Sequence, residues 1–175
     1  MYSDPLHGHP LRRLFAGLIE QVFNAELGVC DPRLTDYLGD LLTDFVHVDH
    51  IYRLRTVDGE TIRDISRMQA EAVLVDVHDE TERARQIHRY IGDFTLFWSG
   101  VYPESLQRRG RGGRLYEYLA QGKRGYEIAG ELSRPGDEPE ADMLRKLSSE
   151  FETCVHGLHL VRESWMQAAR SNKSN

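Results

Sequence analysis

The segment that most restricts the folds open to this chain is 89–106, RYIGDFTLFWSGVYPESL. From Ile91 onward nearly every position in it is apolar, aromatic or small. Read as a helix, it carries two opposite faces that suit burial. The first has the spacing of a core-facing stripe and consists of Ala84, Ile87, Ile91, Phe94, Trp98 and Val101. The second consists of His88, Gly92, Thr95 and Ser99. Two buried sides predict a central helix over 84–100, with other helices packed around it.

Periodic apolar residues predict further helices on both sides of this segment. One begins at Pro10 and ends near Gly28, and the next begins after the Asp31-Pro32 start signal. Two more are expected over 61–77 and 114–132. The β-branched run at 72–77 also suits a strand, although we favour helix there. A turn signal at Asp58-Gly59 indicates either a loop or a short β-hairpin over 51–60.

The C-terminal part of the chain has the most regular pattern. Apolar residues recur at alternating steps of three and four, at Leu144, Leu147, Phe151, Cys154, Leu158, Val161, Trp165 and Ala168. This pattern predicts one long C-terminal helix. The helix is expected either to lie along the bundle or to form a homodimer through 144–168.

Length and composition favour one all-α domain over 1–175, a bundle of about six helices with an ordered core at about 10–170. The hydrophobic fraction of 40% and the charged fraction of 29% are typical of a soluble globular protein. The net charge of −6 argues against a nucleic-acid partner. Two cysteines make no disulfide framework, and we find neither a signal peptide nor a stretch that suits a membrane. We therefore expect a cytoplasmic protein.

Two blocks of the sequence resemble a family of uncharacterised bacterial helical proteins. The first is IGDFTLFWSGVYPESL, with the pattern GD-x-x-LF-x-SG-x-x-PESL, and the second contains Y-x-x-x-G-x-x-x-Y at 118–126. An earlier segment, YLGDLLTDFVHVD at 37–49, is also similar. The resemblance implies an all-helical fold and a bacterial origin. It implies no activity and supplies no catalytic residues.

Three groups of residues are candidates for a binding site. Asp40, Asp44 and His47 share one face of the second helix and suggest metal ligands, although a solvated helix face is the simpler interpretation. An arginine-rich loop could bind an anion or could simply be solvated, through Arg108, Arg109, Arg111 and Arg114. Polar residues of the central helix could line a pocket or could reflect close helix packing, namely His88, Asp93, Thr95, Trp98 and Ser99, with Tyr126 from the 114–132 helix.

These observations leave three hypotheses for the function. The first is an interaction or accessory protein without enzymatic activity. Helix faces with regularly spaced apolar residues are abundant in the sequence, and no nucleophile with an adjacent base is visible. The second is a protein that binds or senses a small molecule beside the central helix. The third is a metal-dependent enzyme centred on Asp40, Asp44 and His47. We expect no cofactor.

Overall fold

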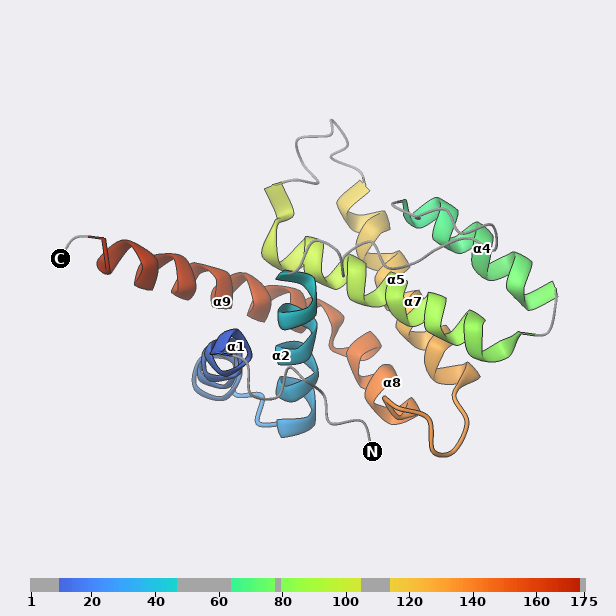
Figure 1. The fold of residues 1–175 in the computed structure, drawn as a ribbon, viewed down its shortest axis with the longest axis horizontal. Helices are drawn as coiled ribbons and strands as arrows, with labels where there is room; N and C mark the ends of the chain where they lie inside the picture. Colours follow the sequence, from blue (N-terminus) through green and yellow to red (C-terminus); the bar gives the residue numbers. More distant parts are fainter. Residues whose placement is uncertain (1–9, 47–63, 78–79, 105–113, 174–175) are drawn as a thin grey trace.

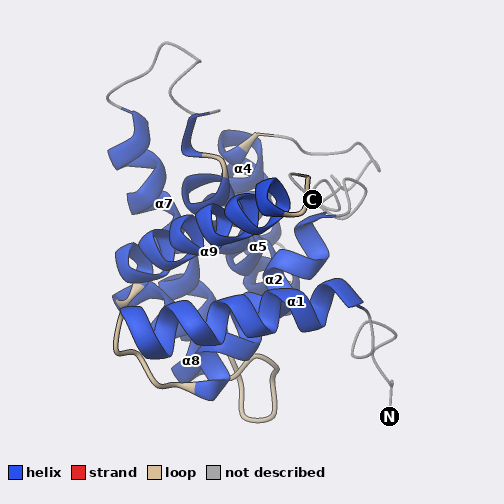
Figure 2. Ribbon diagram, turned by 90° about the vertical axis from the view of Figure 1, so that its left-hand side faces the viewer, coloured by secondary structure: helices blue, strands red, loops and turns tan. Residues whose placement is uncertain are grey.

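The computed structural model describes residues 10–46, 64–77, 80–104 and 114–173. They form an all-α bundle, and no strand occurs among them (Figure 2). The elements are α1 (Pro10–Glu20), a π-helical turn η1 (Gln21–Glu26), α2 (Pro32–Val46), α4 (Ile65–Val77), α5 (Thr81–Val101), α7 (Arg114–Leu132), α8 (Ala141–Ser149) and α9 (Phe151–Ser171). The predicted all-α fold is therefore confirmed.

Helix α5 is the central element, as its two apolar sides predicted. It packs against α2, α4, α7 and α9, with α4 and the α1–α2 pair on different sides of the bundle (Figure 1). From Tyr90 to Val101 every residue of α5 is buried except Trp98, which is partly exposed. A helix with so little exposed surface is stable only where neighbouring helices cover it on several sides.

Helices α5 and α7 approach each other through glycines. A methyl group added at Gly92 would lie 2.7 Å from the Tyr126 ring, and one added at Gly125 would lie 2.6 Å from the carbonyl oxygen of His88. Atoms do not approach this closely without a clash, so larger residues would push the two helices apart. The small residues predicted on the second face of the central helix therefore serve close packing at this crossing.

The N-terminal helices begin and end at the residues that the sequence indicated. Pro10 and Pro32 are the first residues of α1 and α2. The Asp31 carboxylate accepts hydrogen bonds from the backbone N–H groups of Arg33 (3.0 Å) and Leu34 (3.3 Å), which is an N-cap. Gly28 follows η1 with a φ of 67°, a conformation that glycine adopts readily.

The C-terminal segment differs from the prediction of one long helix. It forms α8 and α9, which are separated at Glu150 (φ −100°, ψ 19°). Helix α8 packs mainly against α7, whereas α9 crosses α5 and α1 (Figure 1). A single straight helix could not follow both paths, and the Ser148-Ser149 pair just before the break is a weak helix former.

Three other local predictions have different outcomes. Residues 65–77 are helical, so the alternative of a strand at 72–77 is wrong. The central helix extends to Val101, so Gly100 lies inside it, where a methyl group would be 2.7 Å from Leu158. The hairpin at 51–60 lies outside the described residues.

Candidate functional site

A buried carboxylate joins three helices at the centre of the molecule. Asp93 on α5 is 2% exposed, and its Oδ1 accepts hydrogen bonds from the hydroxyl groups of Tyr37 on α2 (2.5 Å) and Tyr126 on α7 (2.7 Å). Arg89 Nε donates to the Tyr37 hydroxyl oxygen at 3.2 Å and lies 3.7 Å from Asp93 Oδ2. A buried carboxylate needs such partners, because burial without them costs several kcal/mol, on the order of 2–7 for a polar group and more for a charge.

The tyrosines of this network are held as neutral hydrogen-bond donors. Burial, reinforced by the negative charge of Asp93, raises the pKa of Tyr126 well above its ordinary value of 10.0. The same causes raise the pKa of Tyr37. Neither the carboxylate nor Tyr126 is among the residues that line the two cavities described below. The network therefore connects α2, α5 and α7, and its polar groups form hydrogen bonds with one another.

The six residues predicted to line a pocket lie in different surroundings. Asp93 and Tyr126 meet in the network described above. Thr95 is fully buried and donates to the carbonyl oxygen of Ile91 at 2.7 Å. Ser99 is buried, whereas His88 is partly exposed. Trp98 lines a cavity that lies among α1, α2, α5 and α9.

This cavity has a volume of about 270 Å³ and a mostly apolar lining. An apolar cavity of about 150 Å³ already holds benzene in an engineered protein, so there is room for a larger molecule. Six of its twelve lining residues are aromatic. The full lining is Phe15, Leu42, Phe45, Val46, Phe97, Trp98, Val101, Tyr102, Leu158, Val161, Arg162 and Trp165. We call it the aromatic cavity.

Contacts between the rings set the shape of the wall. Phe97 lies 5.0 Å from Phe45 and 5.6 Å from Trp98, measured between ring centroids, and Trp165 meets Phe15 edge-on at 5.4 Å. Such separations are those of favourable aromatic pairs. The indole N–H of Trp98 is buried and has no hydrogen-bond partner within the described part of the chain. The wall is therefore built from rings in contact and contains one donor without a partner.

Arg162 on α9 is the one charged residue in the described lining of the aromatic cavity. Its Nη1 and Nη2 lie 2.8 and 2.7 Å from the two carboxylate oxygens of Glu104, and Nη1 also donates to the carbonyl oxygen of Val101 at 2.8 Å. The guanidinium lies over the Tyr102 ring, 5.3 Å from its centroid. The hydrogen bond with Glu104 raises the pKa of Arg162 above its ordinary value, so this end of the cavity carries a permanent positive charge.

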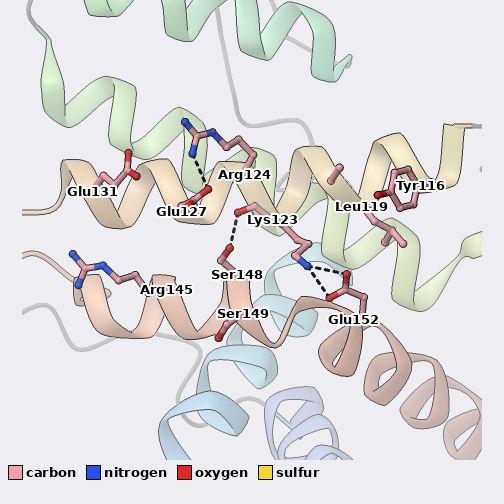
Figure 3. Close-up of a pocket in the computed structure, with 11 residues that line it drawn as sticks. Tyr116, Leu119, Lys123, Arg124, Glu127, Glu131, Arg145, Ser148, Ser149 and Glu152 are labelled. Atoms are coloured by element: carbon pink, nitrogen blue, oxygen red, sulfur yellow. Dashed lines mark hydrogen bonds and ion pairs between the residues drawn. The ribbon is translucent and has the colours of Figure 1, made fainter.

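A second, polar groove of about 670 Å³ lies between α7 and the α8–α9 segment (Figure 3). Five of its six charged side chains form ion pairs with one another or with a neighbour. Lys123 bonds Glu152 at 2.9 Å, Arg124 bonds Glu127 at 2.7 Å, and Arg145 bonds Asp142 at 3.1 Å, a carboxylate outside the lining. The hydrogen bond from Lys123 lowers the pKa of the Glu152 carboxyl. Because cations and anions alternate, the groove presents no concentrated charge to a ligand.

The predicted metal and anion sites are described in part. Asp40 accepts a hydrogen bond from Arg12 Nε at 2.8 Å, while His47 lies outside the described residues. Within the described ranges, no group of three His, Cys, Asp or Glu side chains is arranged to hold a metal ion. Arg114 begins α7, and the other three arginines of the predicted anion site, at 108, 109 and 111, also lie outside the described residues.

Several residues of the network and the cavity were not predicted. Tyr37 and Arg89 complete the Asp93 network, and Phe15 and Arg162 line the aromatic cavity. They come from separate helices, and the sequence carries no signal of which helices meet. One usable signal was the tryptophans, because both of those in the chain, Trp98 and Trp165, line the same cavity.

Comparisons with protein-family models, with curated proteins and with solved structures found no significant match to this chain. None of the helices in the described ranges combines the length and the apolar character of a membrane span. The fold and its sites thus define a class, an all-α bundle with an aromatic cavity beside its central helix. The function has to be argued from that geometry.

Proposed function

We propose that this protein binds a small, largely apolar molecule in the aromatic cavity. The observation that carries the proposal is the combination of a volume of about 270 Å³ with a lining of aromatic and aliphatic side chains and one arginine. Ligand sites are usually concave and apolar, with a small number of placed polar groups. Tyr102 is 39% exposed and Val46 is 36% exposed, so part of the wall is at the surface and gives a route of entry.

Intrinsic fluorescence is a direct test, because the only two tryptophans of the chain line the cavity. We expect 1-octanol, a neutral apolar probe, to change the tryptophan emission in a saturable way. Val161→Phe places a larger side chain in the cavity and should abolish the change. Leu119→Phe enlarges a residue of the polar groove and should leave it intact.

Circular dichroism on each variant separates a filled cavity from a misfolded chain, because overpacking costs about 1–3 kcal/mol. Octanol should also raise the melting temperature of the wild type, since a ligand stabilises the state that binds it. An emission that changes only linearly with octanol, or that saturates equally in a folded Val161→Phe variant, would contradict the proposal.

We propose a second function, binding of a protein partner through the outer side of α4, on a separate observation. Val73 and Leu74 on this helix are 63% and 56% exposed, while Met68 and Ala72 are buried against the bundle. Among the described residues, α4 therefore carries apolar side chains on its outer side as well as on the side that packs against the bundle. Exposed neighbouring apolar residues often mark interaction sites. The first partner to test is a second copy of this chain.

A further inference from the structure

The Arg162–Glu104 pair shows how the aromatic cavity would recognise its ligand. Both guanidinium Nη atoms face the two oxygens of one carboxylate, at 2.8 and 2.7 Å. This two-pronged geometry matches the planar fork of arginine to the planar carboxylate, and it distinguishes carboxylates from single-point acceptors. The guanidinium also donates to the Val101 carbonyl oxygen and rests on the Tyr102 ring, which fixes its direction.

Arg162 belongs to the wall of the cavity, whose other described lining residues are apolar or aromatic. The site therefore presents one positive group at the edge of an apolar space. A molecule that complements both parts has an apolar body and a single anionic head. A purely apolar molecule would use the cavity and leave the guanidinium with its internal partner.

In the unliganded protein, the Glu104 carboxylate occupies the place at Arg162 that the anionic head of the ligand would take. Its side chain is 41% exposed and the Arg162 side chain is 20% exposed, so the pair lies at the surface. Ion pairs at the surface contribute little to stability, roughly 0–1 kcal/mol. A second carboxylate can therefore replace Glu104 at Arg162 at low cost, provided that the cavity stabilises the rest of the molecule.

We infer that the ligand is an apolar carboxylate, an aliphatic or aromatic acid, whose head group binds Arg162 in place of Glu104. The inference rests on the proposed function, because it needs the cavity to accept the apolar body. It adds the chemical class of the ligand and assigns Glu104 as an internal competitor for the same arginine.

The test compares octanoate with 1-octanol, which have the same chain length and different heads, by tryptophan fluorescence of the full chain at neutral pH. Arg162→Gln should weaken the affinity for octanoate about tenfold, which is the range for the loss of a hydrogen bond to a charged group. It should leave the affinity for octanol within about twofold of the wild-type value. Glu104→Gln should strengthen the affinity for octanoate about threefold, because it removes a competing charge from Arg162. The affinity for octanol should again stay the same. Glu152→Gln, which alters an exposed ion pair with Lys123 in the polar groove, is the matched control and should change neither affinity.

The outcomes separate this inference from the proposed function. Octanol binding with no selective loss of octanoate in Arg162→Gln overturns the inference and leaves the cavity as an apolar site. Failure of both probes to bind the wild type overturns the proposed function and the inference together. If Arg162→Gln does not fold, Glu104→Gln decides, because unchanged octanoate affinity in that variant also overturns the inference.

Discussion

At the scale of single residues, the Asp93 carboxylate has the largest structural role. It receives hydrogen bonds from Tyr37 and Tyr126, which come from helices on different sides of α5. Asp93 belongs to the GD pair of the block IGDFTLFWSGVYPESL, and Tyr126 ends the Y-x-x-x-G-x-x-x-Y pattern at 118–126. Both residues were singled out in the sequence as candidates for a ligand pocket, but in the structure their polar groups bond to each other.

Tyr126→Phe tests how much this network contributes to the stability of the fold. The variant keeps the ring against Gly92 and removes one donor to a buried carboxylate, so we expect a loss of about 1.5–3 kcal/mol in the free energy of unfolding. Urea unfolding measures it. Tyr116→Phe, whose side chain is 81% exposed, is the control and should change stability by less than about 0.5 kcal/mol.

The loss should also depend on pH. The folded-state pKa of Tyr126 is raised above 10.0, so its contribution is complete below the unfolded-state pKa and is lost as the pH rises above about 10. The wild type should therefore lose its advantage over Tyr126→Phe in alkali. An equal difference at neutral and strongly alkaline pH would show that the hydroxyl is not held neutral by the fold.

At the scale of elements, the boundaries of helices followed local signals, whereas their breaks and contacts did not. Pro10, Pro32 and Gly28 mark starts and an end because they act through backbone geometry alone. The break at Glu150 has no glycine or proline beside it and arises where α8 and α9 turn to different neighbours. Gly100 illustrates the same limit, because it lies inside α5 although glycine often ends a helix, and a methyl group there would be 2.7 Å from Leu158.

The crossing of α5 and α7 offers a matched pair of glycine substitutions. Gly125→Ala places a methyl group 2.6 Å from the backbone oxygen of His88, which cannot move aside as a flexible side chain would. We expect this substitution to destabilise the protein by about 1–3 kcal/mol or more. Gly17→Ala in α1 meets nothing within 4 Å and should be neutral or stabilising by up to about 1 kcal/mol.

Thermal or urea unfolding of both variants gives the comparison. Equal stability of Gly125→Ala and Gly17→Ala would mean that the two helices are not in close contact at this point.

At the scale of the whole molecule, the first part of the regular apolar pattern over 144–168 packs inside the chain. Leu144, Leu147 and Phe151 are fully buried, as are Cys154 and Leu158. Burial also raises the pKa of the Cys154 thiol to about 12, so it stays protonated at neutral pH. Because these side chains are already covered by the rest of the chain, a substitution such as Leu158→Glu would test folding and not self-association. The exposed apolar residues of α4 are the better candidates for contact between copies.

Light scattering over a range of concentrations tests this alternative. If α4 joins two copies, the mass should rise above the monomer value of 20.2 kDa, and a Val73→Ser, Leu74→Ser double variant should return it to that value. Met166→Glu, on the exposed end of α9, is the control and should not affect the mass. A wild type that stays monomeric throughout excludes a second copy as the partner of α4. A change in mass confined to Met166→Glu would place the contact on the last helix.

The sequence by itself determined that this chain is all-α, that its centre is one helix with two buried sides, and where several helices begin. These properties depend on periodicity and backbone preference, which act over a few neighbouring residues. Only the tertiary structure decided that Tyr37, Asp93 and Tyr126 meet, and that Phe15, Trp98 and Arg162 line one cavity. Those residues are far apart in the chain, and their meeting depends on how whole helices cross, which no local pattern encodes.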